Sequence, residues 1–513
     1  MVMQMLRAAS GFLVVAICAF ASVGQAADKN EIVVAQPVLR QQFDPTVLVA
    51  TTDFMPQDMI YDGLFNLTED GITPALALSW VISDEGKQID FTLREGVTFQ
   101  NGDPFTAEDV KFTLDRVRAS DSKHAYRKPF QDAIKDIVVL APNKIRFVLT
   151  GPWPGYFTGV RNATVGMVPK NYYEKVGPEG FQKAPIGTGP FKLKGSKAGE
   201  WTEFSAFDDY WGGRPNVDLV KKLLVKEEFT RYAMLTRNEA DIVMGISGPL
   251  LSKIRADGKA RIIFSKYSGT SGFYFNKTSF PESQDPRVRL AIGHAIDLKA
   301  IANDILGGVC EPASSIFTPA TFGHLPGLDI ISYDPEKSKK LLAEAGIKPG
   351  MELTDAIHTA SFGSLPNAPA VQEAIAGYLE AVGFKIKREP YDTGAWLKMM
   401  RAGKQPNIFY GPSSIPDDGS ATMESWFLST SPWSSGNISV PEYDEIFKKQ
   451  LVETDVEKRR GLLQGFAREE HTRHAGLPLF WCNTPFAIGP RVKEWSTSLG
   501  SGYQMNLDKL TLN

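Results

Sequence analysis

Hydrophobic and polar residues alternate most clearly in residues 88–94, where Ile89, Phe91 and Leu93 are separated by polar side chains. Alternation at period two is typical of a half-buried strand. The alternation resumes in residues 97–99 after a turn that contains a glycine. We therefore expect two short strands that pair with each other.

The next segment changes to the periodicity of a helix. Thr106 stands three residues before Asp109, which is the spacing of a capping box, and Val110, Leu114 and Val117 follow at i, i+4 and i+7. This pattern predicts a capped helix with one buried face.

Similar local signals continue along the chain. Residues 31–35 predict a short buried strand, and residues 143–150 predict another. Asp-Pro pairs at 285–286 and 334–335 predict two helix starts, and His294 falls outside the apolar stripe of the first helix, so we expect it to be solvated. Strand and helix patterns alternate over residues 352–486, which indicates an α/β fold.

The first 26 residues predict a secretory signal peptide. They carry one basic residue, Arg7, then an uncharged apolar run, and end in small residues suited to cleavage. Cys18 follows the bulky Ile17 inside that run, so we do not expect a lipid anchor there. The mature chain is long enough for two or three domains of ~100–200 residues, and no second apolar run approaches the ~18 residues of a membrane span.

Charge and cysteine content limit the partners and the covalent cross-links that we expect for this protein. The formal net charge is -3, without a long run of either sign, so nucleic acid or an anionic membrane is not an expected partner. Cys310 and Cys482 remain after processing. In an oxidising compartment they are able to pair, but connectivity is not readable from sequence, and two free buried thiols are the interpretation we favour.

The stretch from Pro74 to Val117 also resembles a family signature. It reads PALALSWVISDEGKQIDFTLREGVTFQNGDPFTAEDVKFTLDRV, and it is similar to the extracellular solute-binding proteins of family five, the peptide/nickel-type receptors of ABC importers. The strings GTGPF within residues 185–194 and DDYWGGRP at residues 208–215 resemble the same family. The resemblance is specific because its blocks are long and occur in order.

The resemblance implies a periplasmic binding protein of class II-like α/β fold, with two lobes, a hinge and an extra domain inserted in the first lobe. Placed on this sequence, it gives a signal peptide at 1–26, lobe I at 27–60, 190–280 and 487–513, an inserted domain at 61–189, and lobe II at 281–486. It implies a monomeric receptor that captures a peptide or another polar organic solute and delivers it to permease subunits in the inner membrane, with no cofactor.

Candidate ligand-binding residues come from three arguments. Arg40 lies on the loop that leaves the strand at 31–35, and in open α/β sheets ligands bind outside the carboxyl ends of strands. The resemblance supplies the next ones. Peptide-binding relatives hold the ligand's amino group with an aspartate, whose place here falls at Ser413 or Ser414, with Asp417 and Asp418 a few residues on. Independently of the resemblance, candidate aromatic packing surfaces for a ligand are Tyr126, Tyr391, Trp396 and Tyr410, and burial in the core stays open as the alternative for each.

Dipeptide binders carry arginines at the start of a helix that corresponds here to residues 367–370. This chain has Pro369 and Ala370 at that place, and neither side chain has a charge for a carboxylate. An ordinary dipeptide held by both ends is therefore not the expected ligand.

Catalytic signatures are missing from the sequence. It has no GxSxG, CxxC, P-loop or dinucleotide fingerprint, and Ser120 to Lys123 match S-x-x-K without its partner motifs. His471 and His474 at i, i+3 do not complete a tetrahedral metal shell. A secreted hydrolase or metalloenzyme stays open as the alternative, as does a sensory or chaperone-like binding protein that feeds no transporter.

Overall fold

The structure is a computed structural model of the 513-residue chain. It describes residues 30–48, 56–68, 71–124, 127–152, 165–359, 365–413, 418–431, 438, 440–453, 455–497 and 505–513. The predicted signal peptide lies outside these residues. No helix within them is long and apolar enough to cross a membrane.

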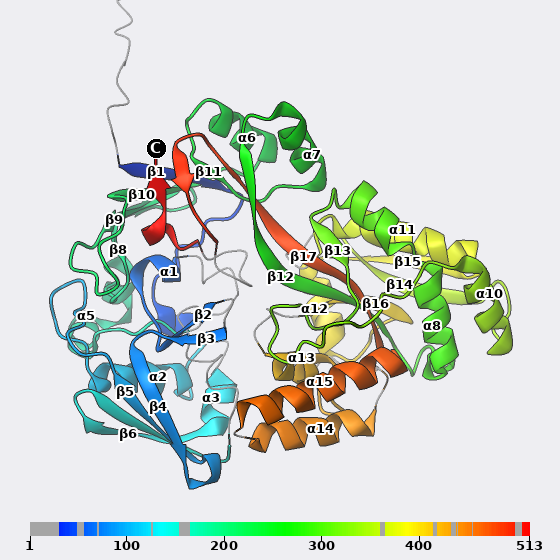
Figure 1. Ribbon diagram of the computed structural model, residues 1–513, viewed down its shortest axis with the longest axis horizontal. Helices are drawn as coiled ribbons and strands as arrows, with labels where there is room; N and C mark the ends of the chain where they lie inside the picture. Colours follow the sequence, from blue (N-terminus) through cyan, green and yellow to red (C-terminus); the bar gives the residue numbers. More distant parts are fainter. Residues whose placement is uncertain are drawn as a thin grey trace, which may run out of the picture.

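One sheet runs through the described part of the molecule and holds eleven of its strands (Figure 1). A first half-sheet is built from β11, β1, β10, β9 and β8, and a second half-sheet from β15, β14 and β16. The long strands β12 and β17 belong to both halves, and the short β13 pairs with β17. Their bounds are β1 Glu31–Gln36, β8 Phe191–Lys197, β9 Trp201–Ala206, β10 Leu219–Leu224, β11 Ile242–Val243, β12 Arg261–Phe275, β13 Cys310–Pro312, β14 Glu352–His358, β15 Lys385–Tyr391, β16 Ile408–Ser413 and β17 Gly476–Ile488.

Both half-sheets contain parallel strands. β1 runs parallel to β10 and β11 in the first half, and β14 runs parallel to β15 and β16 in the second. β12 and β17 are antiparallel to each other over their length. The molecule is therefore an α/β fold in which two strands connect two groups of parallel strands.

Helices cover the sheet on both faces. In β1, Ile32 and Val34 face one core, which includes α1, α5 and the C-terminal segment, while Ala35 faces a second core with α6 and α7. The second core continues into the helices around β14–β16. The helices of these layers are α1 Gln57–Ile60, α5 Lys170–Lys183, α6 Glu228–Thr236, α7 Gly248–Asp257, α8 Pro286–Ala295, α9 Leu298–Ala300, α10 Pro335–Glu344, α11 Ala368–Ala381, α12 Thr393–Arg401, α13 Gly419–Trp426, α14 Pro441–Val452 and α15 Val456–Arg473, with short turns of helix at Pro45–Val47 (η1), Asp84–Gly86, Pro281–Gln284, Ile301–Ile305 and Leu507–Lys509.

A smaller sheet with its own core lies at the lower left of Figure 1. Its strand order is β4-β5-β7-β6, and α2 and α3 pack beside it. The bounds are β4 Ala77–Ser83, β5 Gln88–Leu93, β6 Ile134–Ala141, β7 Lys144–Leu149, α2 Ala107–Arg118 and α3 Arg127–Ala133; two hairpins, β2 Phe65–Thr68 with β3 Gly71–Pro74 and β18 Val492–Glu494 with β19 Thr511–Leu512, complete the strands. How the chain divides into domains stays a prediction.

Two buried side chains join the segments that enter and leave this smaller unit. Gln100 donates its amide hydrogens to the carbonyls of Ile60, Gly189 and Phe191 at 2.8–3.0 Å. Asp62 accepts from the hydroxyl of Thr188, the hydroxyl of Tyr210 and the indole of Trp211 at 2.7–3.1 Å. Burial raises the pKa of Asp62 to about 6, although these three donors lower it.

The predicted helix after Thr106 is confirmed. Asp109 accepts from the amide and hydroxyl of Thr106 at 2.9 and 3.0 Å, and Val110, Leu114 and Val117 are fully buried. The helix starts predicted at the two Asp-Pro pairs are confirmed as α8 and α10.

The predicted strand pairing is wrong. β5 forms as expected, but it pairs with β4 and β7, which occupy both of its hydrogen-bonding edges. Residues 97–99 instead close a tight turn through a bridge between Thr98 and Pro104. Gly102 sits in that turn with φ 90°, a conformation that glycine adopts without strain.

Two further predictions are corrected. His294 is buried, not solvated, because α10 packs across α8, and its Nδ1 lies 2.7 Å from the carbonyl of Ser332. Cys310 and Cys482 form a disulfide instead of staying free. They face each other directly on the antiparallel strands β13 and β17, so the sheet itself brings them together.

Candidate functional site

The long strands change partners where the two half-sheets meet. Residues 261–265 of β12 pair with residues 484–488 of β17, and residues 269–274 pair with residues 476–482. The ladder is irregular between Ser265 and Gly269. The ladder is irregular again between Ser271 and Gly272. A break in a ladder is a place where a strand is able to bend, and we expect the longer break, which leaves residues 266–268 without register partners on β17, to be the hinge between the halves.

Tyr267 occupies the break with φ 53°, which is unusual for a residue with a bulky side chain. Its backbone N–H donates to the side-chain oxygen of Asn483 at 2.9 Å, replacing the missing ladder contact. Strained backbone of this kind is concentrated at functional positions.

A row of four residues crosses the sheet beside the break. Thr270 lies opposite Ser413 on one side and opposite Trp481 on the other, and Trp481 lies opposite Glu311. We call these four positions the hinge row. Residues that are directly opposite in antiparallel strands point to the same face of the sheet. The ring of Tyr267 packs edge-on against Trp481, with 6.3 Å between ring centroids.

The carboxyl ends of the parallel strands form one edge in each half. In the first half, β1 ends at Gln36, and the buried Arg231 holds the neighbouring loops by donating to the carbonyls of Val225, Met244 and Gly245 at 2.6–2.8 Å. Within the described residues, neither side-chain atom of the buried Gln36 has a hydrogen-bond partner.

In the second half, β14 ends at His358 and β15 at Tyr391. The His358 ring packs against Trp396 at 5.0 Å, and burial lowers the pKa of this imidazole to about 4. Asp355 is buried three residues earlier in β14, and its Oδ2 lies 3.4 Å from the Tyr410 hydroxyl. Burial raises the pKa of Asp355 to about 8.

A cavity of about 600 Å³ lies where the loop after β1 meets α2. Thr46 and Val47 line it from that loop, and Lys123 lines it from the segment after α2. No hydrogen bond or ion pair involves Lys123 among the described residues. A concave pocket with polar groups in its lining is a default hypothesis for a ligand site.

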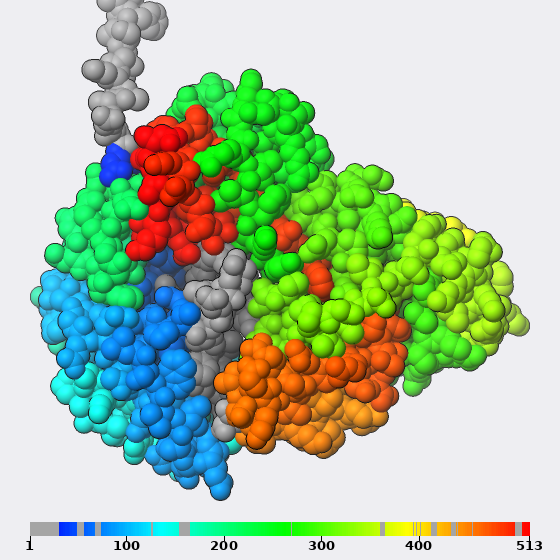
Figure 2. All heavy atoms as spheres, viewed as in Figure 1, coloured from blue at the N-terminus to red at the C-terminus, as the bar shows by residue number. Residues whose placement is uncertain are grey.

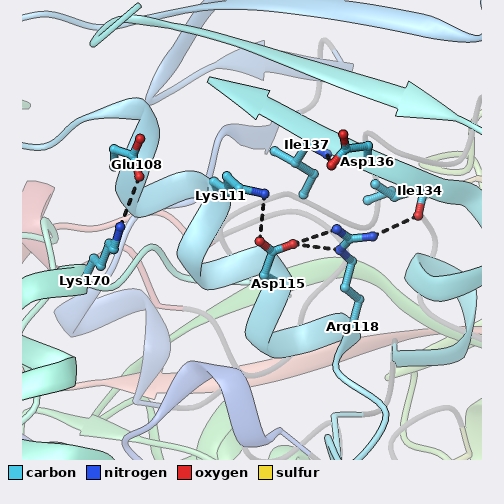
Figure 3. Close-up of polar contacts among 8 residues, drawn as sticks. All are labelled: Glu108, Lys111, Asp115, Arg118, Ile134, Asp136, Ile137 and Lys170. Atoms are coloured by element: carbon cyan, nitrogen blue, oxygen red, sulfur yellow. Dashed lines mark hydrogen bonds and ion pairs between the residues drawn. The ribbon is translucent and has the colours of Figure 1, made fainter. Parts of the chain in front are cut away.

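Most charges at this cavity are already compensated (Figure 3). Asp115 pairs with both Lys111 and Arg118, with nitrogen to oxygen distances of 3.0 and 2.7 Å, and Glu108 pairs with Lys170 at 3.1 Å. The charged lining residues without an ion pair among the described residues are Arg116, Asp121 and Lys123, so the cavity presents a polar surface of mixed charge.

The structure brings three of the predicted ligand residues next to His358. Tyr391 lies opposite it on β15, the Trp396 ring packs against it, and a hydrogen bond joins it to the backbone of Tyr410. Arg40 is exposed beyond β1, and the Tyr391 hydroxyl donates to Glu389 at 3.0 Å. Trp396 packs on His358, and Tyr410 is fully buried within β16. The ligand roles of these four residues stay predictions.

Asp418 has a structural role in addition to its predicted one. It caps α13 and forms a two-pronged ion pair with the buried Arg459, with distances of 2.7 and 2.8 Å. Tyr126, Ser414 and Asp417 lie outside the described residues, and of Ser413 only the backbone is described.

Sequence reasoning did not find Tyr267, Trp481, Thr270 or Glu311. Their proximity depends on which strands pair and in what register, and no local motif carries that information. The sequence offered one local signal for a site, which is that Trp481 and Asn483 stand two residues apart in a long apolar strand. This spacing is equally typical of residues that pack in a core.

The histidine pair does not extend to a metal centre in the part of the chain that is described. His471 and His474 lie with ring centroids 5.9 Å apart, and no group of three or more histidine, cysteine or acidic side chains able to hold a metal occurs among the described residues. His474 ends α15 in the left-handed conformation, and burial lowers its pKa to about 4.

Comparisons with known proteins agree with the resemblance in the sequence. The model of the bacterial extracellular solute-binding proteins, family 5 Middle, matches residues 71–434. Heme-binding protein A of Haemophilus influenzae is 26% identical over 484 residues, covering 89% of this chain and 88% of that protein. The dipeptide-binding protein of Escherichia coli is 25% identical over 445 residues, covering 81% of this chain and 83% of that protein.

Solved structures show the same two-lobed α/β fold. NikA from Brucella suis in complex with Fe(III)-EDTA superposes with a TM-score of 0.84 at 23% identity, covering 94% of this chain and 100% of that chain. HbpA2 from Haemophilus parasuis superposes with a TM-score of 0.83 at 22% identity, with the same coverage. If the two half-sheets with their helices are the two lobes, which stays a prediction, the ladder break at Tyr267 lies between them.

Proposed function

Because the chain belongs to the bacterial extracellular solute-binding proteins of family 5, and is thus a receptor and not a hydrolase, we propose that it captures its solute between the two lobes at the hinge row. The observation that carries the proposal is the single sheet shared by both half-sheets, with β12 irregular against β17 between Ser265 and Gly269 and again between Ser271 and Gly272. Two rigid bodies joined at such a stretch are able to close on a ligand.

Closure is driven by contacts that exist only in the closed form. A ligand that touches both lobes binds the closed state more tightly than the open one, and this difference in affinity shifts the population. Polar groups at the two carboxyl edges, such as Gln36 in lobe I and His358 in lobe II, lie where such contacts form in open α/β sheets.

The ligand is a peptide, a modified peptide or another small polar organic molecule. Relatives named for dipeptides and heme are about equally similar to this chain, so their names do not select a ligand for it. Pro369 and Ala370 begin α11 without a charged side chain, which argues against a dipeptide held by its carboxylate at that helix.

The receptor works in the periplasm as a monomer and passes its ligand to permease subunits of an ABC importer in the inner membrane. Membership in an extracellular family and the N-terminal apolar segment support this placement. Co-purification of the permease with the receptor separates uptake from a purely sensory or chaperone-like role.

Native mass spectrometry of the mature protein tests the proposal. We expect a releasable small-molecule adduct in the native spectrum that disappears in the denatured one. At ~100 times the Kd, a ligand adds about 2.7 kcal/mol to the free energy of unfolding, so adding the released compound raises the melting temperature. Turnover of that compound by the purified protein, or a melting temperature that no peptide or polar solute raises, contradicts the proposal.

A further inference from the structure

The hinge row places an unpaired carboxylate beside an aromatic ring. Glu311 is exposed, and within the described residues it has no hydrogen bond or ion pair. Its direct neighbour across the strands is Trp481, whose indole N–H already donates to the carbonyl of Ser315 at 2.8 Å. The tryptophan is half-buried, so it offers its ring, and not its N–H, to a ligand.

Tyr267 adds a second ring beside the first. Its plane stands at 88° to that of Trp481, so the two rings form a corner. Burial, and after it the charge of Glu311, raise the pKa of the Tyr267 hydroxyl.

Thr270 completes the row with an unused acceptor. Its side chain is almost fully buried, and its hydroxyl has no hydrogen-bond partner in the described part of the chain. Buried hydroxyls are normally paired. This one lies directly opposite Trp481 and on the same face of the sheet.

We propose that the hinge row is a subsite for a positively charged group of the ligand, an amine or quaternary ammonium, held by the Glu311 carboxylate and the rings of Trp481 and Tyr267. Aromatic faces attract cations within about 6 Å of the ring centroid. A carboxylate next to such faces favours a cation over an anion or a neutral group. For a primary amine, the Thr270 hydroxyl supplies a further acceptor.

The backbone at Tyr267 supports a role for its ring. An asparagine or glycine adopts φ 53° with less strain than a tyrosine. The strain at Tyr267 is therefore explained if its ring contacts the ligand, because an asparagine or glycine at this position has no such ring.

The inference rests on the proposed receptor function, and it names the class of solute. Choline and its neutral isostere 3,3-dimethyl-1-butanol are the probes, titrated into the mature protein and followed by ligand-observed NMR at low ionic strength. We expect choline to bind at least about tenfold more tightly than the isostere.

Four variants locate the binding. Glu311→Gln weakens choline about tenfold, whereas Glu282→Gln, which changes an exposed glutamate far from the row, has no effect. Tyr267→Phe keeps the affinity because the ring stays. Tyr267→Asn loses it without lowering the melting temperature, because asparagine relieves the backbone strain while removing the ring.

Equal affinities for the two probes, no detectable choline binding, or unchanged binding by Glu311→Gln each overturn the subsite. If the Tyr267→Asn variant binds choline like the parent, the Tyr267 ring is not part of the subsite. None of these results affects the receptor function, which the native mass spectrum, the turnover assay and the melting temperatures test separately.

Discussion

Buried ionisable side chains are the clearest feature of the receptor at the scale of single residues. Asp355 is fully buried in β14, and within the described residues its Oδ1 has no hydrogen-bond partner. Burial favours the neutral form of a carboxyl, and here it outweighs the charge of Arg388, which lies opposite on β15 and lowers the pKa. Burial accordingly raises its pKa from 3.8 to about 8.

This shift makes Asp355 a pH-dependent element of stability. Because the folded-state pKa lies above the unfolded one, its contribution is fully present below pH 3.8 and is lost as the pH rises through about 8. Asp355→Asn has no charge to bury, so we expect its free energy of unfolding to fall less than that of the parent between pH 4 and pH 8. Urea unfolding at both pH values measures this difference.

The exposed Asp209 provides the control, since Asp209→Asn should follow the parent curve. If Asp355→Asn follows it as well, the carboxyl is ionised in the folded protein and the argument from burial is wrong. The Tyr410 hydroxyl, 3.4 Å away, would then be its donor.

At the scale of elements, the disulfide fixes the lobe II side of the hinge. Cys482 lies opposite Gly269 on β12 and is bonded to Cys310 on β13, and Asn483 is the next residue of β17. We expect Cys310→Ala/Cys482→Ala to lower the free energy of unfolding by about 2–4 kcal/mol, because the bond closes a long loop in the unfolded chain.

Denaturant unfolding of the double variant, compared with the parent, measures this loss. The disulfide is buried, so the alanines also test whether the strands stay paired without it. A double variant as stable as the parent would show that β13 and β17 hold their register through the sheet alone, and that the bond adds nothing.

A glycine in the GTGPF segment is required by a close approach of two backbones. A Cβ on Gly189 would lie 2.5 Å from the carbonyl carbon of Ile60, where the chain enters and leaves the smaller unit. We expect Gly189→Ala to destabilise by more than about 2 kcal/mol, since backbone atoms on both sides must move.

Gly377 on α11 is the matched control because nothing lies within 4 Å of its added Cβ. Gly377→Ala should stabilise the protein by up to ~1 kcal/mol through helix propensity. Thermal melting of both variants measures the two effects. Similar melting temperatures for both would mean that the contact at Ile60 relaxes at no cost.

Local signals in the sequence were sufficient for many of these elements. The capping box of α2 and the Asp-Pro starts of α8 and α10 depend on residues a few positions apart, so they are readable without the fold. The partners of β5 and the burial of His294 depend on segments far away in the chain, and both predictions were wrong.

The candidate site depends even more on distant pairing. Tyr410 was predicted as a ligand surface, but β16 lies between β12 and β14, which leaves its ring inside the sheet's packing. The hinge row takes one residue from each of four strands spread over residues 270–481, so no window of sequence contains it.

At the scale of the whole molecule, the shape follows from two strands shared by two lobes. Figure 2 shows the blue and cyan segments on the left and the yellow-green and orange segments on the right, and in Figure 1 β12 and β17 run side by side between these two groups. We expect each half-sheet with its helices to move as a packed body. We expect the motion between them to concentrate at residues 266–268, the longer of the two irregular stretches of β12.

This architecture predicts a change of shape on binding. Small-angle scattering of the ligand-stripped protein, before and after adding the compound released from it, should show a smaller radius of gyration in the bound form, because a ligand at the hinge row gains its second set of contacts only when the lobes approach. A solute that leaves the melting temperature unchanged is the control and should leave the curve unchanged. Identical curves for the free and bound forms would mean that one lobe binds the ligand alone, and the strained backbone at Tyr267 would then need an explanation other than a hinge.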